Sequence, residues 1–419
     1  MRLNPNNFIG FEPFVLHLSI NQRQMKKTFF LFLTTFFMLS CASNKTVEIA
    51  ISNSSSLNRE NEMVEVSISD VFNKLQLADT AQIVVLDNSG QQVPYQITYN
   101  EKLIFPVIVK ANGEATYSVK HGTPVIFDTK TCGKFFPERL DDVAWENDRI
   151  AFRTYGPALQ ATGEQAYGFD IWAKRVSKPV VEERYAMELN DSTKAEIARL
   201  NKTNKAAAKV LRDNTSYHLD HGNGLDYYNV GPTLGAGTSA FFVNNSLWFP
   251  KCFVKQDILD NGPLRFTVKL DYAPLNVNGD TTIIESRVIT LDAGSQLNKA
   301  VITFLNTKQV LPLATGIVIH KPSIDYTMSA EKGYITYADP KDSVNGQLFI
   351  GAVFPGNLKE TKVAKGHVLA ISDYEPGAEF TYYFGAGWTK WGFNDSASWV
   401  KYISDYAQKV RTPLTVKMK

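Results

Sequence analysis

The chain has 419 residues, with 44 Lys and Arg against 42 Asp and Glu, a formal net charge of +2. Hydrophobic residues make up 44% and charged residues 21%, which is typical of a globular protein and excludes a disordered, collagen-like or polytopic membrane chain. The near-neutral balance also argues against nucleic acid as a partner, because nucleic-acid binders usually carry a basic excess.

The N-terminal segment predicts a bacterial lipoprotein. A Lys-Lys pair precedes an apolar run over 29–38, and this run ends at Leu39-Ser40-Cys41, which resembles a lipobox. The run is too short to span a bilayer. We therefore expect a signal peptide and lipobox over 25–41, lipidation of Cys41, and an over-extended start over 1–24. The expected location is the bacterial cell envelope, facing the periplasm, with the lipid anchor as the membrane contact.

Residues 41–419 carry 40 basic and 41 acidic side chains, so no long-range field steers a polyanion to the protein. An anionic ligand must then be held by local Arg, Lys or His. Cys132 and Cys252 both lie in Phe-rich segments typical of strands. In an oxidising envelope they either pair or stay as buried free thiols.

The hydrophobic pattern predicts an all-β fold. Short alternating runs separated by turn signals predict a small N-terminal β-sandwich domain over 45–125. Longer alternating runs follow, for example over 281–291, and predict a large antiparallel domain of two packed sheets over 126–419. Helix is scarce, and we expect one helical excursion near 191–212.

The densest polar cluster runs from Tyr217 to Gly231. It holds His218, Asp220, His221 and Tyr228, and a Gly-Asn-Gly segment at 222–224 can fold the chain back on itself. These residue types suit a general base and charge neutraliser at a sugar, or a His/Asp site for a divalent metal. The structural alternative is a loop whose polar side chains satisfy backbone groups. Because no complete ligand set is evident, we expect no metal and no other cofactor.

A second cluster lies at 145–156, where alternation places Arg153 and Tyr155 on one strand face. An Arg that faces a cleft can hold a carboxylate with two parallel hydrogen bonds. The alternative is a surface Arg paired with Glu146 or Asp148.

Three single residues add candidates. Glu285 shares a strand face with Arg287, so it is either a catalytic acid or base or one half of a buried pair. His320 ends an apolar run and is a candidate substrate-binding group. Trp388 lies near Trp391 in a Gly-rich turn, and it either stacks on a sugar ring or packs in the core.

The runs over 145–156, 217–222 and 315–320 resemble the unknown-function domain family numbered 4861. Its members are similar lipoproteins or secreted proteins of Bacteroidota, often encoded beside enzymes that break down pectin-like polysaccharides. The resemblance implies a supersandwich like that of galactose mutarotase and several polysaccharide lyases. It transfers no catalytic residue, since the chemistry of the family is not settled.

The leading hypothesis is a lyase acting on uronate-containing, pectin-like oligosaccharides. Arg153 and Tyr155 would hold the substrate carboxylate, and His218 or Tyr228 would take the C5 proton. The remaining polar side chains of the cluster, Tyr217, Asp220 and His221, would orient or protonate the substrate.

Two alternatives remain open at this point. One is a mutarotase-like or epimerase-like enzyme on a free sugar, with Glu285 as base and His218 or His320 as acid. The other is a non-catalytic glycan-binding lipoprotein that uses Trp388 and Trp391.

Overall fold

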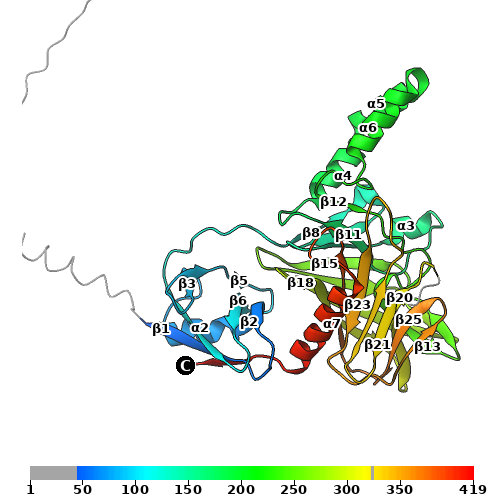
Figure 1. The fold of residues 1–419 in the computed structure, drawn as a ribbon. Coiled ribbons are helices and arrows are strands. Elements are labelled where there is room, and N and C mark those ends of the chain that lie inside the picture. Colours follow the sequence, from blue (N-terminus) through cyan, green and yellow to red (C-terminus); the bar gives the residue numbers. More distant parts are fainter. Residues whose placement is uncertain (1–44, 322–324) are drawn as a thin grey trace, which may run out of the picture. The chain divides into compact units, whose positions relative to one another are not determined.

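The computed structural model describes residues 45–321 and 325–419 (Figure 1). Two sheets form its N-terminal part, in strand orders β27-β1-β7-β3-β4 and β2-β6-β5. The strands are β1 (Thr46–Ser52), β2 (Arg59–Ser67), β3 (Ile83–Leu86), β4 (Gln92–Val93), β5 (Gln96–Ile97), β6 (Lys102–Val109), β7 (Glu114–His121) and β27 (Thr415–Met418). Helix α2 (Ile68–Leu75) lies between β2 and β3 in the chain and buries Val71 and Leu75 with them.

Alternation explains this part of the fold. Val47, Ile49 and Ile51 of β1 are buried in one hydrophobic core, while the side chains between them are exposed or only half-buried. The last strand, β27, pairs antiparallel with β1, although the sequence pattern assigned all of 126–419 to the larger domain. The end of the chain is thus a strand of the N-terminal sheet.

Three further sheets build the larger part. Their strand orders are β12-β11-β10-β9-β8, β14-β13-β20-β25-β24 and β15-β16-β18-β19-β26-β23-β22-β21, with β17 paired to β18. The first sheet uses β8 (Cys132–Phe136), β9 (Asp142–Glu146), β10 (Ala151–Thr154), β11 (Asp170–Lys174) and β12 (Gly224–Asp226). The second uses β13 (Ala236–Val243), β14 (Ser246–Trp248), β20 (Leu311–Val318), β24 (Glu360–Ala364) and β25 (His367–Tyr374). The third uses β15 (Phe253–Asn261), β16 (Arg265–Tyr272), β17 (Leu275–Val277), β18 (Asp280–Asp292), β19 (Leu297–Leu305), β21 (Tyr326–Ser329), β22 (Tyr334–Ala338), β23 (Leu348–Val353) and β26 (Phe380–Trp388).

Every pairing between these named strands is antiparallel, and the prediction of an all-β fold is confirmed. The longest strand, β18, shows the reason. Its inward face carries Ile283, Ile289 and Leu291, which are buried in a core shared by all three sheets. The opposite face is half-buried or exposed, as a period of two residues requires.

Helices are few among the described residues, and three of the six α-helices lie in one excursion between β11 and β12. The expected excursion near 191–212 forms two helices, α5 (Asp191–Thr203) and α6 (Lys205–Thr215), preceded by α4 (Val181–Leu189). Asn190 and Asn204 cap α5 and α6 through their side chains. Figure 1 shows α5 and α6 side by side as a hairpin that projects from the sheets.

The other helical segments are η1 (Pro137–Arg139), α3 (Pro157–Ala161) and α7 (Ser396–Arg411). Helix α7 buries Trp399, Ile403 and Ala407 with residues of β22 and β23. The expected signal peptide, lipobox and Cys41 lie outside the described residues. Within the part of the chain that the structure describes, no helix is long and apolar enough to cross a membrane.

Candidate functional site

The guanidinium of Arg153 on β10 is the centre of a buried polar cluster on the first sheet. Its Nε donates to Oδ2 of Asp170 at 2.9 Å, and Nη2 lies 2.8 Å from Oδ2 of Asp226. Nη1 donates to the Tyr185 hydroxyl at 3.3 Å and lies 3.8 Å from Oδ2 of Asp142. Three carboxyl groups from β9, β11 and β12 therefore surround one guanidinium, and we call these groups the Arg153 cluster.

The sheet face that carries Arg153 is covered rather than open. Tyr185 of α4 and Tyr217 pack on it together with Trp172, and the Tyr217 ring stacks on Trp172 with centroids 4.9 Å apart. Arg153 is only 4% exposed, so it does not face a cleft. Every contact of its guanidinium among the described residues is internal, which leaves no face for a substrate carboxylate.

Tyr155 and Tyr217, both predicted to bind substrate, are also internal. The Tyr155 hydroxyl donates to Oδ2 of Asp170 at 2.6 Å, and both residues are buried. The Tyr217 hydroxyl accepts a hydrogen bond from Nε of Arg139 at 2.8 Å. These tyrosines support the cluster and its cover.

The cluster holds protons more tightly than ordinary carboxylates do. Burial raises the pKa of Asp142 to about 6 and that of Asp226 to about 8, although the positive charge of Arg153 opposes both shifts. The charge of Asp170 adds to the shift at Asp226. Asp226 therefore holds its proton more readily than an exposed aspartic acid does.

Above the cluster, residues 216–226 form a loop closed by its own polar groups. The backbone N–H of Asp226 donates to the Tyr217 carbonyl at 2.9 Å, and the His221 ring Nε2 lies 2.9 Å from the Ser216 carbonyl. Gly224 has φ +102°, and a Cβ there would lie 1.9 Å from the Ala173 carbonyl oxygen, so only glycine fits this close approach.

His218 is the group of this loop that is best placed for proton transfer. Its side chain is 53% exposed, and Nδ1 lies 2.9 Å from the backbone carbonyl oxygen of Asp226. Since a carbonyl can only accept, Nδ1 carries the proton and the neutral ring presents its Nε2 lone pair. This Nε2 has no partner among the described residues.

Asp220, two residues after His218 in the sequence, lies close to two cations. Its Oδ1 accepts the backbone N–H groups of Gly222 and Gly224 at 2.9 and 3.1 Å. Its Oδ2 lies 3.5 Å from Nη2 of Arg175 and 3.7 Å from Nζ of Lys390. Burial opposes the charge of Asp220, but these donors and cations outweigh it and lower its pKa.

His320 and Tyr228 form a separate polar group. His320 Nδ1 lies 2.6 Å from Oδ1 of Asp339, and Nε2 lies 2.5 Å from the Asn229 carbonyl oxygen. Burial alone would lower the pKa of His320, but the hydrogen bond and negative charge of Asp339 outweigh burial, and the pKa of His320 is raised. With an acceptor at each nitrogen, His320 is suited to be an imidazolium that donates twice.

Tyr228 packs edge-on against His320, with ring centroids 5.0 Å apart. Burial raises the pKa of Tyr228 well above its ordinary value, and the charges of Asp339 and Asp170 add to the effect. Its hydroxyl has no hydrogen-bond partner among the described residues. Tyr228 is therefore a neutral phenol whose hydroxyl can donate a hydrogen bond, and it is unsuited to remove a proton.

Glu285 and Trp388 both lie in the interior of the protein. Glu285 is 1% exposed and accepts a hydrogen bond from Nε of Arg287, and burial raises the pKa of Glu285. Trp388 is 1% exposed and donates from Nε1 to the Asn345 carbonyl at 2.7 Å. Glu285 is thus one half of a buried ion pair, and Trp388 packs in the core, which are the structural alternatives stated for them in the sequence analysis.

Several residues of this region were missed by sequence reasoning. Arg175 and Lys390 reach Asp220 from segments more than 200 residues apart in the sequence, so no local pattern joins them. Asp170 had a usable signal, because it is a single acid in a run of apolar strand residues, Phe169 to Ala173. A buried charge of that kind implies a buried partner.

Among residues 45–321 and 325–419, no three His, Cys, Asp or Glu side chains are arranged to hold a metal ion. A cavity of about 310 Å³ lies between the end of β23 and the start of β26, lined in part by Phe354, Ser372, Glu379 and Phe380. It contains none of the residues of the His218 loop.

The fold and the polar loop define an all-β sandwich protein with an exposed histidine over a buried acid cluster. The chain belongs to the family described as Domain of unknown function (DUF4861), which matches residues 51–416. This confirms the resemblance drawn from the sequence. The chain is 28% identical over 415 residues to "Uncharacterized protein P7" of Formosa agariphila, covering 93% of this chain and 98% of that protein.

Solved structures with a similar arrangement include two from Enterococcus faecalis. One is an alpha-mannosidase with a TM-score of 0.48 and 11% identity, covering 90% of this chain and 47% of the other. The second is a protein in the glycosyl hydrolase family 38, with a TM-score of 0.47 and 10% identity, covering 90% of this chain and 48% of the other. The chain thus spans about half the length of these structures.

Proposed function

We propose that this protein is a carbohydrate-active enzyme that performs acid–base chemistry on an acidic oligosaccharide at the 216–226 loop. The observation that carries the proposal is the exposed His218 ring, whose Nδ1–H is held by the Asp226 carbonyl while Nε2 is free. A base needs this arrangement, in which one nitrogen fixes the tautomer and the other faces the substrate.

The finer proposal is lysis of a uronate-containing chain. His218 Nε2 takes the C5 proton, the C4–O bond breaks, and a C4=C5 double bond forms. The departing oxygen then receives the proton from the His218 imidazolium, so the step consumes no external acid or base. His218 can act first as the base and then as the acid, because Nε2 receives the C5 proton and the same Nε2–H later gives it to the departing oxygen.

Arg175 and Lys390 are the groups proposed to neutralise the substrate carboxylate. Their side chains are 38% and 31% exposed, and both already lie within 4 Å of one carboxylate, that of Asp220. Arg153, which the sequence favoured for this task, is buried and saturated. A second carboxylate beside Asp220 would be held by the same two cations, which is the charge balance that an acidic sugar needs.

The alternative with Glu285 as base is less well supported. A base must reach the substrate, and Glu285 is buried against Arg287 on the inward face of β18. A binding protein that uses Trp388 has the same difficulty, since that indole is also buried.

The test is turnover of uronate-rich oligosaccharides, with products identified by mass and by absorbance of the new double bond. His218→Gln should reduce turnover by about 10²-fold or more, since a positioned acid–base group contributes that much. The matched control is His121→Gln, because His121 is an exposed histidine on β7. Unchanged turnover in His218→Gln would overturn the assignment, and retention on a glycan column without turnover would favour a binding protein.

We also propose that the protein is anchored in the bacterial envelope through Cys41. The Lys-Lys pair, the apolar run and Leu39-Ser40-Cys41 support this location. Incorporation of labelled fatty acid should occur in the wild-type protein and be absent from Cys41→Ser. Equal labelling of both would contradict the proposal.

A further inference from the structure

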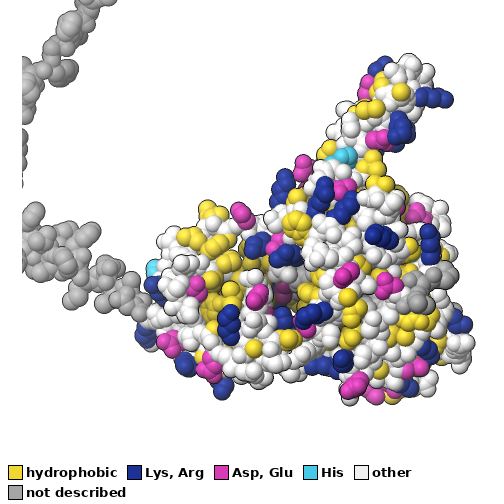
Figure 2. Space-filling model, in the orientation of Figure 1, with side chains coloured by type: hydrophobic (Ala, Val, Ile, Leu, Met, Phe, Trp, Pro, Cys, Tyr) yellow, Lys and Arg dark blue, Asp and Glu magenta, His cyan; other side chains and the backbone are white. Residues whose placement is uncertain are grey.

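The α5–α6 hairpin carries an excess of positive charge that the fold does not use. Residues 191–215 contain six basic and three acidic side chains, whereas residues 41–419 as a whole contain 40 basic and 41 acidic ones. The basic residues are all exposed, and they are Lys194, Arg199, Lys202, Lys205, Lys209 and Arg212. The net positive charge is therefore local to the hairpin, and Figure 2 shows Lys and Arg side chains over α5 and α6.

Packing does not explain the hairpin. Helix α5 buries no residue, and α6 buries only Ala208. The two helices therefore contribute little hydrophobic stabilisation, because that contribution is proportional to the apolar area that is buried. A hairpin over residues 191–215 that contributes so little to the stability of the fold points to a role at the surface.

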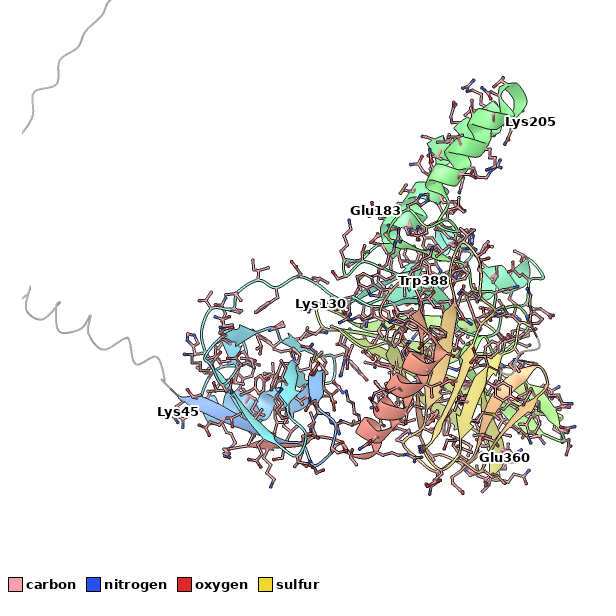
Figure 3. All side chains as sticks on the ribbon, viewed as in Figure 1. Lys45, Lys130, Glu183, Lys205, Glu360 and Trp388 are labelled. Carbon is pink, nitrogen blue, oxygen red and sulfur yellow. The ribbon has the colours of Figure 1, made fainter. Side chains whose placement is uncertain are left out.

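Internal ion pairs leave much of the charge available. Arg199 pairs with Glu196 at 2.6 Å and Lys209 pairs with Asp213, both on the exposed surface of their own helices. Exposed pairs of this kind contribute little to stability, so a ligand can compete for them. Among the residues that the structure describes, no ion pair forms at the remaining lysines, Lys194, Lys202 and Lys205. Lys205 lies at the tip of the hairpin (Figure 3).

We propose that the α5–α6 hairpin binds an acidic polysaccharide chain and presents it to the 216–226 loop. The helix spacing supports this, because Lys205, Lys209 and Arg212 recur at i, i+4 and i+7 and so lie along one face of α6. The helix itself runs into the loop, since α6 ends at Thr215 and the loop begins at Ser216. The kind of polyanion rests on the proposed function, whereas binding itself rests on the hairpin's own charge.

An anionic membrane is the competing partner, and the side chains argue against it. Helices that lie in a membrane interface carry Trp, Phe or Leu on a continuous apolar face. Residues 191–215 contain no aromatic side chain, and Ile197, Leu200 and Leu211 are half-buried. Val210 alone among the large apolar residues of the hairpin is strongly exposed.

The test compares two triple variants with the same change in net charge. Lys194→Glu/Lys202→Glu/Lys205→Glu reverses charge on the hairpin, and Lys110→Glu/Lys332→Glu/Lys341→Glu reverses it at exposed sites elsewhere. Binding to polygalacturonate is measured at low and at high salt, with thermal unfolding as the control for folding. The hairpin variant should bind about tenfold or more weakly at low salt, and the wild-type affinity should fall as salt rises.

Three results would overturn the inference. They are equal binding by the hairpin variant and the wild type, equal loss in both triple variants, and binding to phosphatidylglycerol vesicles but not to polygalacturonate. The measurement needs no turnover. If His218→Gln leaves turnover unchanged while the hairpin variant loses binding, the proposed site is wrong and the hairpin inference stands.

Discussion

The Nδ1 atom of His218 lies 2.9 Å from the backbone carbonyl oxygen of Asp226 and 3.8 Å from the carboxyl group of the same residue. That carboxyl group is in turn 2.8 Å from Nη2 of Arg153. One aspartate therefore connects an exposed imidazole to the buried cluster. The orientation of the ring depends on a strand, β12, whose position is set by charges inside the protein.

Removing the Arg153 guanidinium should be strongly destabilising. Arg153→Met leaves three buried carboxyl groups without their cation, so we expect the free energy of unfolding to fall by about 3 to 5 kcal/mol. Chemical denaturation measures this change. Arg149→Met, at an exposed position on the preceding turn, is the control and should change stability by about 0.5 kcal/mol or less. Similar small losses in both variants would show that the cluster does not depend on Arg153.

The cluster also predicts how stability depends on pH. Asp142 and Asp226 have pKa values of about 6 and about 8, above the ordinary value of 3.8. Between the unfolded and folded pKa values the folded state binds more protons, so a rise in pH favours unfolding. The contribution of Asp226 is therefore present below about pH 4 and is lost as the pH rises through about 8.

Asp226→Asn isolates this contribution. The amide does not titrate, so its stability should decline less than that of the wild type between about pH 5 and about pH 8. His367 has the opposite effect on the pH dependence of stability, because burial lowers its pKa. His367 is present in both the wild type and Asp226→Asn, so its contribution cancels when the two pH profiles are subtracted. Asp213→Asn, on the exposed face of α6, is the matched control. Parallel pH profiles for wild type and Asp226→Asn would contradict the raised pKa.

Local pattern was sufficient for some features of the site and insufficient for others. Arg153 lies on β10 and Tyr155 follows its last residue, and both side chains contact Asp170 from one side, as alternation suggested. Glycines of the Gly-Asn-Gly segment take the positive φ that a tight return of the chain after His221 requires. What covers the Arg153 face could not be read from the strand itself. The cover comes from Tyr185 of α4, a helix that the sequence did not predict.

The partners of Arg153 were hidden for a related reason. Asp170 and Asp226 reach it through antiparallel pairing of β10 with β11 and of β11 with β12, and the second pairing spans the whole helical excursion. Sequence periodicity describes which face a residue occupies, but sheet topology decides which residues share that face.

The two cysteines that the structure describes should be unreactive in the folded protein. Both are free thiols, and burial raises the pKa of Cys132 to about 12 and that of Cys252 to about 11. The thiolate is the reactive form, so modification by a thiol reagent at neutral pH should require unfolding. Mass spectrometry after labelling in buffer and in denaturant measures this. Rapid labelling of the native protein at Cys132 would show that β8 opens.

Glu285 and Arg287 offer a test that separates a structural role from a catalytic one. Glu285→Gln leaves the Arg287 charge buried without a counter-ion, so we expect a loss of about 3 to 5 kcal/mol in the free energy of unfolding. The double variant Glu285→Leu/Arg287→Met removes both charges and should recover most of that loss, since buried ion pairs are often replaceable by apolar side chains. A double-mutant cycle by chemical denaturation gives the coupling between the two residues. A stable double variant that has lost turnover on a free sugar would instead assign Glu285 to catalysis, whereas retained turnover leaves the pair as part of the core.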